Sequence, residues 1–505
     1  MKSDELFALL RRRGVLWPTA EPYGGTQGLY DYGPLGAALK QRIEAAWSTW
    51  FLSLSDDYYR IEPSEILPEA VVRASGHLEN FTDPEVTCAN CHAAFRAETI
   101  LEKFRPAGVD GLNAEQIGEL VKQSHAKCSS CGSDSLSVPR PFNMMFALSF
   151  GVTGKETVYL RPETAQNAYI SFPRMWEVGR RALPLGVAVI GRAYRNEIAP
   201  RQVLFRMRAF TQAELQIFFD PASFPVPWEA VRDQKLPILR AERRERGEEA
   251  PEPKTVGELV DSGGLPGFYV YHLFEMFRFY RDVLGYSENA IRFLEKSDKE
   301  RAFYNRIQFD LEVALDSLGG FKELGALHYR GDYDLSRHAA GSTKDLSVLL
   351  PDGRRIVPHV LELTFGVDRN LWALADLGLR TEGERVVWHL PAYLAPVPVA
   401  VFPLLRKEHG EYAHRLVEEL RREGIPAAYD DAGSIGRRYA RMDEAGAPFC
   451  VTVDGETVDP SHAHHLTVTV RERDSKLQER RAVSGLAGHF RAALRLPRPS
   501  GTPAT

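Results

Sequence analysis

The stretch Ile190–Phe219, IGRAYRNEIAPRQVLFRMRAFTQAELQIFF, predicts the part of the fold around which the chain is organised. Residues 187–192, which lead into this stretch, show an apolar run, and 210–219 at its end show the two-residue alternation; both patterns are typical of β-strands. Between them, Glu197–Val203 is a turn-prone loop around Pro200. The stretch therefore predicts a long hairpin. Its second strand would carry Leu215, Ile217 and Phe219 on one face and Glu214, Gln216 and Phe218 on the other.

The predicted hairpin carries five arginines: Arg192, Arg195, Arg201, Arg206 and Arg208. Buried guanidinium groups need partners, so this number is too large for a hairpin that only packs in a core. The planar fork of arginine suits a bidentate grip on phosphate or carboxylate, and Phe210 offers an aromatic face on which a base could stack. Two interpretations therefore stay open: a hairpin that binds an anionic ligand, and an exposed hairpin with solvated charges.

Further motifs follow one another along nearly the whole chain and carry a resemblance to a known family. Motif 2 of the class II aminoacyl-tRNA synthetases resembles Arg195-Asn196-Glu197 together with Phe205-Arg206, Phe210 and Glu214. Motif 1 resembles YDYGPLGAAL at Tyr30–Leu39, and the end of motif 3 resembles GVDR at Gly366–Arg369. Within the class, the chain is similar to the dimeric, single-chain glycyl-tRNA synthetases. The shared phrases are YGGTQGLYDYGPLG (Tyr23–Gly36), SGH (Ser75–His77), LRPETAQ (Leu160–Gln166) and RNEIAPR (Arg195–Arg201).

The resemblance implies both a fold and a reaction. The fold would be an α+β catalytic domain, with an antiparallel sheet flanked by helices, followed by a mixed α/β anticodon-binding domain. The reaction would attach glycine to tRNA(Gly) in two steps. Glycine and ATP, with Mg²⁺, would form glycyl-adenylate, and the 3′ end of the tRNA would then accept the glycyl group.

The motifs also imply a role for individual residues. Catalysis would depend on Arg195 at the α-phosphate, on Arg369 at the γ-phosphate, and on Glu323 as a Mg²⁺ ligand. The expected ATP site consists of Arg195, Asn196, Glu197, Phe205, Arg206, Phe210, Glu323, Leu324, Gly366, Asp368 and Arg369. The expected glycine site consists of Arg96, Glu163, Phe210, Gln212, Glu214, Glu362, Thr364 and Gly366. In this arrangement Phe210 would stack on adenine against the plane of Arg369, and the glutamates would hold the ammonium group.

Some positions depart from the family pattern. The family phrase FRxREFEQME is FRMRAFTQAE here, so Ala209, Thr211 and Ala213 replace two glutamates and a methionine. Asn167 follows PETAQ in place of glycine, and Thr364 stands in place of serine. These changes lie beside the predicted substrate sites. Two alternatives therefore stay open: another class II synthetase, and a catalytically inactive paralogue that binds nucleic acid, as the accessory subunit of mitochondrial DNA polymerase does.

Composition and charge limit the other classes of protein. The chain has 505 residues, 44% apolar and 26% charged, which is ordinary for a globular protein with two or three domains. The net charge of −5 means that an RNA-binding surface would have to be a local basic face. The sequence has no run of about 18 apolar residues, and its first residues lack the apolar centre of a signal peptide. We therefore expect no membrane association and a cytoplasmic location.

Four of the five cysteines form two CxxC pairs, Cys88/Cys91 and Cys128/Cys131. Each pair can offer two thiolates from a tight turn, and two such pairs complete a tetrahedral zinc site. Four thiolates leave no open coordination position, so the spacing predicts a structural Zn²⁺. Four free core thiols are the simpler alternative.

The predicted domains follow from these motifs and from changes in composition. Residues 1–390 would be the catalytic domain, with a zinc-binding insertion at about 85–135 and a helical insertion at about 222–305. Prolines after Leu390 mark a hinge, and the strands and helices that alternate over 391–495 predict the anticodon-binding domain. The last residues, 496–505, are expected to be a disordered tail.

A helix is predicted from Pro34 to about Trp50. Its apolar stripe consists of Leu39, Ile43, Ala46, Trp47 and Trp50. A core helix and a dimer interface both fit such a stripe. Because a stripe with two tryptophans would leave a large apolar surface exposed in a monomer, we expect a homodimer.

Overall fold

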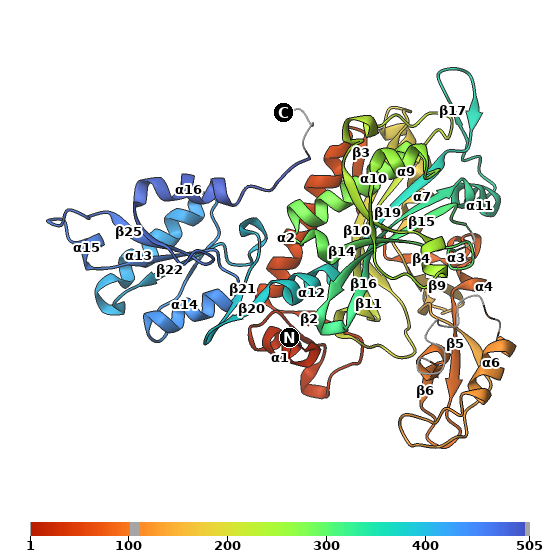
Figure 1. Cartoon of the computed structure of the whole chain (residues 1–505), viewed down its shortest axis with the longest axis horizontal. Coiled ribbons are helices and arrows are strands. Elements are labelled where there is room, and N and C mark those ends of the chain that lie inside the picture. The colour runs from red at the N-terminus through yellow and green to blue at the C-terminus, as the bar shows by residue number, and fades with distance from the viewer. Residues whose placement is uncertain (1, 102–111, 113, 303, 500–505) are drawn as a thin grey trace.

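The computed structural model describes residues 2–101, 112, 114–302 and 304–499, which form two domains and a small lobe (Figure 1). The larger domain is built on a nine-stranded sheet, and the C-terminal domain on a five-stranded sheet. The lobe, orange in Figure 1, projects from the larger domain. Within the described residues, no helix combines the length and the apolar character that crossing a membrane requires.

The nine-stranded sheet has the order β13-β12-β14-β15-β16-β19-β11-β10-β3. Its strands are β13 (Glu252–Thr255), β12 (Lys235–Leu239), β14 (Ile291–Glu295), β15 (Ile307–Leu315), β16 (Gly320–Gly331), β19 (His359–Gly366), β11 (Ala209–Phe219), β10 (Leu185–Tyr194) and β3 (Tyr58–Ile61). All neighbours are antiparallel except β10 with β3 and β12 with β14. The predicted hairpin is confirmed as β10 and β11, and the predicted antiparallel sheet surrounds it.

Helices cover both faces of this sheet. On one face lie α2 (Pro34–Phe51), α10 (Gly267–Arg278) and α12 (Val367–Gly378), and on the other lie α7 (Ala165–Val178) and α11 (Tyr333–Ser342). The predicted alternation in β11 decides which side chains meet which helices. Leu215, Ile217 and Phe219 pack in the core with α2 and α12, whereas Phe218 packs with α7. The sheet is therefore enclosed on both faces, as the alternating pattern requires.

The apolar stripe of α2 does not form an exposed surface, which corrects the premise of the dimer prediction. The exposed fraction of Trp47 is 0% and that of Trp50 is 1% within the single chain. Phe279, which directly follows α10, packs against Trp50 and Phe51 with ring centroids 6.3 and 5.1 Å apart. The stripe is thus used in the core of its own chain, because a segment more than 200 residues away covers it.

Residues 222–305 differ from the predicted helical insertion. They contain α9 (Val256–Asp261) and α10, but they also contribute the strands β12, β13 and β14 to one end of the main sheet. In β14, Ile291 and Phe293 are buried, and the strand pairs with β15 along its whole length. The segment is therefore a mixed extension of the main sheet, since β14 pairs with β15, β12 with β14, and β13 with β12.

The small lobe holds the two cysteine pairs. It contains a three-stranded sheet of β6 (Ala94–Arg96), β5 (Thr82–Thr87) and β7 (Arg140–Asn143), with α5 (Ala97–Leu101) and α6 (Ala114–Gln123). Residues 102–111 and 113, which belong to the predicted insertion, lie outside the described residues.

The C-terminal domain confirms the predicted mixed α/β organisation. Its sheet has the order β23 (Ala427–Tyr429), β22 (Val399–Pro403), β24 (Phe449–Val453), β25 (Thr467–Glu472) and β26 (Gln478–Ala482). The pairs β22/β23 and β22/β24 are parallel, and the others are antiparallel. The helices are α13 (Arg406–Arg422), α14 (Ile435–Glu444), the short α15 (Gly455–Val458) and α16 (Leu486–Ala493). Of the predicted tail, 500–505 lie outside the described residues.

Candidate functional site

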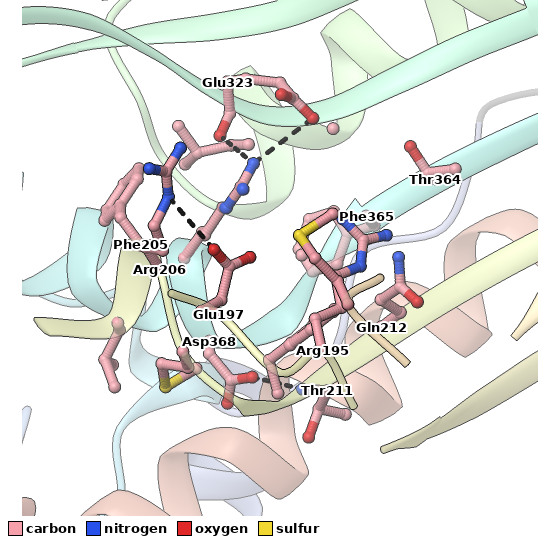
Figure 2. Close-up of a pocket in the computed structure, with 18 of the residues that line it drawn as sticks. Arg195, Glu197, Phe205, Arg206, Thr211, Gln212, Glu323, Thr364, Phe365 and Asp368 are labelled. Atoms are coloured by element: carbon pink, nitrogen blue, oxygen red, sulfur yellow. Dashed lines mark hydrogen bonds and ion pairs between the residues drawn. The ribbon is translucent and has the colours of Figure 1, made fainter. Parts of the chain in front are cut away.

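A cavity of about 250 Å³ lies where the β10–β11 loop, the start of β16 and the junction of β19 with α12 meet. The predicted ATP-site residues that line it are Arg195, Glu197, Phe205, Arg206, Phe210, Glu323, Leu324, Gly366, Asp368 and Arg369. Figure 2 shows Glu197 and Arg206 on one side of this cavity and Arg195, Gln212 and Thr364 on the other. The fold thus brings together predicted ATP-site residues that are up to 174 positions apart in the sequence.

Arg195 presents its guanidinium group between two aromatic rings. The rings of Phe81 and Phe210 have centroids 5.3 and 5.2 Å from the guanidinium carbon. Its Nε donates a hydrogen bond of 3.0 Å to the carbonyl oxygen of Pro162. Among the described residues, no carboxylate forms an ion pair with Arg195. Its two terminal nitrogens are therefore oriented and available for an anionic ligand.

Arg206 and Glu197 face each other without forming a close ion pair. The Nε of Arg206 lies 3.8 Å from Oε2 of Glu197. Nη1 of Arg206 and Oε2 of Glu197 are both shielded from solvent, and neither has a hydrogen-bond partner among the described residues. Burial lowers the pKa of Arg206, and nearby Arg96 lowers it further. Unsatisfied buried polar groups are unfavourable, so this pair is suited to a ligand that satisfies both groups.

Arg369 lies in the first turn of α12 and reaches Glu323 on β16. Its Nη1 donates to the carbonyl oxygen of Glu323 at 3.0 Å and lies 3.3 Å from the carboxylate of the same residue. The ring under its guanidinium group belongs to Phe205, at 5.8 Å. The ring of Phe210 lies beside Arg195, at 5.2 Å, and the predicted stacking of adenine between Phe210 and Arg369 stays a prediction.

The surroundings of Glu323, the predicted Mg²⁺ ligand, suit this role. Its side chain is about half exposed at 47%, whereas Glu312, its register partner on β15, is bound to Arg292 at 2.7 Å. Burial raises the pKa of Glu323, but Arg369 and Lys296 outweigh this effect and keep it below its ordinary value. An ionised, partly exposed carboxylate beside a polar cavity fits the oxygen donors that Mg²⁺ prefers.

Two predicted ATP-site residues have other roles. The Asp368 carboxylate accepts hydrogen bonds from the backbone N–H of Thr211 and from the hydroxyl of Tyr32. Asp368 is buried, and burial raises its pKa. It therefore joins α12 to β11 and forms part of the cavity wall. Asn196 does not reach the cavity but lines a neighbouring one of about 640 Å³.

The predicted glycine-site residues fall into two groups. Those that line the cavity are Arg96, Phe210, Gln212, Thr364 and Gly366. Of these, Arg96 is held by Asp83 at 2.7 Å and Glu98 at 3.2 Å. The carboxylates Glu163, Glu214 and Glu362 are not part of the cavity lining. They lie in a buried polar network, with Glu214 on β11 and Glu362 on β19 pointing to the α7 side of the sheet.

The network keeps these carboxylates in different states. Burial raises the pKa of Glu214 well above its ordinary value, and Glu362 and Glu163 raise it further, while Thr164 donates a hydrogen bond of 2.7 Å to it. Burial also raises the pKa of Glu163, but His77, Arg330 and Gln166 together outweigh burial and hold this pKa below its ordinary value. Arg330 donates to Glu362 at 2.8 Å. Carboxyl groups outnumber the arginine that pairs with them in this network, so the network is suited to a cationic ligand.

Arg330, Asp83 and His77 are site residues that the sequence interpretation missed. The side chain of Arg330 is 3% exposed and also binds both carboxylate oxygens of Asp334, at 2.7 and 2.9 Å. The available signal was its position in FKELGALHYRGDYDL (Phe321–Leu335), a segment that also resembles the family. His77 ends the shared phrase SGH (Ser75–His77), which was the available signal for it. Asp83 has no comparable signal, because only the folded chain brings it to Arg96.

The four predicted zinc ligands converge in the small lobe. The Sγ atoms of Cys88, Cys91, Cys128 and Cys131 all lie within 4.8 Å of one another. Two of the separations are 3.6 Å (Cys88–Cys131) and 3.5 Å (Cys91–Cys128), and none of these cysteines forms a disulfide. Thiolates at about 2.3 Å from a tetrahedral Zn²⁺ would be about 3.8 Å apart, so the donor set fits zinc.

Comparisons with known proteins agree with this geometry. A family model described as "Anticodon binding domain" matches residues 398–492. Among solved structures, prolyl-tRNA synthetase from Cryptosporidium parvum, complexed with L-proline and AMP, has a TM-score of 0.57 at 13% identity. The match covers 97% of this chain and 75% of the prolyl-tRNA synthetase chain. This likeness confirms the class II synthetase fold.

Curated relatives match almost from end to end. The glycine–tRNA ligase of Thermococcus gammatolerans is 35% identical over 97% of this chain and 98% of its own length. The glycine–tRNA ligase of Methanococcus vannielii is 34% identical over 98% of this chain and 100% of its own length. The glycine–tRNA ligase of Methanocaldococcus jannaschii is 32% identical over 97% of this chain and 99% of its own length. With this identity over the full length and a fitting cavity, the chain belongs to the glycine–tRNA ligase family.

Proposed function

We propose that this protein is a glycine–tRNA ligase, which activates glycine with ATP and transfers it to tRNA(Gly). The observation that carries the proposal is the Arg195 guanidinium group, which lies in the cavity between two rings and has no ion pair within the described part of the chain. Family membership supports this function over the inactive paralogue and over another class II synthetase. The test is ATP–pyrophosphate exchange with glycine, alanine, serine and proline. Exchange with glycine alone is expected, and its absence would contradict the proposal.

Activation requires alignment of two anions more than proton transfer. The glycine carboxylate is already a nucleophile, so the cavity needs no strong base. Arg195 would bind the α-phosphate and stabilise the charge that develops there, while Arg206 and Arg369 would hold the γ-phosphate end. Glu323 would hold Mg²⁺, which neutralises phosphate charge when bound. Phe205 and Phe210, which already contact guanidinium groups, would provide the aromatic faces for adenine.

Glycine would be selected by its ammonium group and by the small space around it. The carboxylates Glu163, Glu214 and Glu362 would bind the ammonium group, with Arg330 holding Glu362 in place. An added methyl group is worth only about 1–3 kcal/mol in binding, so alanine must be excluded by steric contact. Thr364 and Gln212 line the cavity and would limit its size.

Structural zinc in the small lobe is part of the proposal. Cys88, Cys91, Cys128 and Cys131 would bind one Zn²⁺ per chain and would fix the two CxxC turns relative to each other. Free cysteines throughout the described residues support a reducing compartment such as the cytoplasm.

A homodimer is proposed from the motif resemblance alone, because the stripe of α2 is buried within one chain. Light scattering at micromolar concentration is expected to give twice the chain mass of 56.7 kDa. A monomeric mass would contradict this expectation.

A further inference from the structure

Two loops that are far apart in the sequence pack against each other beside the cavity. One is the β10–β11 loop, 195–208, and the other is 19–29, which joins β1 (Leu16–Pro18) to β2 (Tyr30–Tyr32). The backbone N–H of Arg208 donates to the carbonyl oxygen of Gly28 at 2.8 Å. The side chain of Gln27 donates to the carbonyl oxygen of Pro200 at 3.1 Å. The glycine-rich phrase near the N-terminus therefore supports the loop that carries the ligand groups.

The Arg208 side chain joins the two loops. Its Nε and Nη2 donate to the carbonyl oxygen of Glu197 at 3.3 and 3.0 Å, and its Nη1 donates to the carbonyl oxygen of Gln27 at 3.2 Å. Arg208 is one of the five hairpin arginines for which anion binding and solvation were both left open, and it does not line the 250 Å³ cavity. Its planar fork instead binds two backbone carbonyls at once, which the single ammonium group of lysine cannot reproduce.

Gly28 makes this close approach possible. Its φ is +78°, in the left-handed region that favours glycine. A Cβ atom at this position would lie 2.6 Å from Cβ of Pro200 and 3.4 Å from Cγ of Arg208. A larger residue would therefore force the two loops apart.

The residue that Arg208 holds is one half of the unsatisfied pair in the cavity. Because the carbonyl oxygen of Glu197 accepts two hydrogen bonds from the Arg208 guanidinium group, the backbone at Glu197 is restrained. The Glu197 carboxylate stays 3.8 Å from Arg206, and polar atoms of both residues remain without hydrogen bonds among the described residues. Without this restraint the two opposite charges could close into a direct ion pair and occupy the space that a ligand needs.

We propose that Arg208, together with Gly28, is a positioning residue that keeps Glu197 and Arg206 apart and ready for the nucleotide. This inference rests on the proposed function, since it assigns ATP as the ligand of that pair. The restraint acts on binding in the ground state and the transition state alike, so its loss raises the KM for ATP and leaves kcat nearly unchanged.

The test compares Arg208→Gln, Arg208→Lys and Gly28→Ala with wild type. Arg421→Gln is the matched control, because Arg421 also donates to a backbone carbonyl, that of Ala427 at 3.0 Å, but in the C-terminal domain. Calorimetry measures the Kd for ATP without glycine, and exchange measures KM and kcat. Both Arg208 variants are expected to raise the Kd and the KM for ATP about tenfold, as loss of about 1.4 kcal/mol from two or three hydrogen bonds predicts.

The outcomes separate this inference from the proposed function. Wild type that binds ATP but shows no glycine-dependent exchange would contradict the function, while the Kd values would still test Arg208. Unchanged Kd and KM in Arg208→Gln, or full rescue by Arg208→Lys, would overturn the inference. If Arg208→Gln does not fold, as judged by circular dichroism, Gly28→Ala provides the same test. A fall in kcat with an unchanged KM would also overturn it.

Discussion

Replacement of Arg195 is the most direct test of how the cavity works. Arg195→Ala removes one hydrogen bond to Pro162 and two ring contacts. A hydrogen bond of this kind contributes about 1 kcal/mol and each ring contact about 0.5–1 kcal/mol, so the free energy of unfolding should fall by about 2 kcal/mol. This loss is small enough for the protein to stay folded.

The expected loss of activity is larger than the loss of stability. If Arg195 meets charge that develops on the α-phosphate, its removal should raise the activation free energy by about 3 kcal/mol, or about a hundredfold in kcat. Arg195→Lys should recover little, because the Nε contact and the two rings orient a planar fork. Phe210→Ala removes one of those rings from ground state and transition state alike, so it should mainly raise the KM for ATP.

Glycine-dependent pyrophosphate exchange measures both effects. Arg180→Gln is a suitable control, because the Arg180 side chain is 76% exposed and lies on the surface beside Asp57. Near-normal kcat in Arg195→Ala would refute the assignment of Arg195 to the reacting phosphate. Equal losses in Arg195→Ala and in the control would show that the effect is not specific to the cavity.

Three further predictions concern the metal, pH and the C-terminal domain. Elemental analysis of the native protein should find one Zn²⁺ per chain. The Cys91→Ser variant should lose the metal, and the segment 85–135 should become less stable. The Cys450→Ser variant should keep its metal content, because the Cys450 thiol is buried in the C-terminal domain. Burial and nearby Glu323 raise the pKa of Asp310 to about 6. A carboxyl group whose pKa is raised in the folded state contributes its full stabilisation below the unfolded pKa of about 3.9 and loses it as the pH rises through the folded pKa. The free energy of unfolding measured in urea should therefore fall by up to about 3 kcal/mol between pH 4 and pH 6. The Asp310→Asn variant should abolish this fall. The buried Arg471 lies 2.8 Å from Asp443, so Asp443→Asn removes its counter-charge. The free energy of unfolding of the C-terminal domain should fall by about 3–5 kcal/mol, as measured by thermal unfolding, while glycine-dependent exchange continues. Unchanged melting of Asp443→Asn would contradict this last expectation.

Local patterns in the sequence were sufficient for the hairpin, the family and the cysteine set. The period of two in 210–219 separates the two faces of β11, because alternate side chains of a strand point to opposite sides whatever surrounds them. The family resemblance rested on ordered phrases and is confirmed by relatives that match almost the whole chain. The two CxxC pairs predicted a cluster of four sulfur atoms. This cluster requires only the short spacing within each pair and a single contact between the two pairs in the fold.

Long-range packing decided what the sequence alone could not show. The same apolar stripe of α2 fits a core or an interface, and only the tertiary structure shows that distant segments, Phe279 among them, bury it. The identity of an arginine does not reveal its partner: Arg195 is left open to a ligand, whereas Arg208, in the same hairpin, binds backbone carbonyls 11 and 181 residues away. Side-chain chemistry is a local property of the sequence, but the partner of each charge depends on which distant segments the fold places beside it.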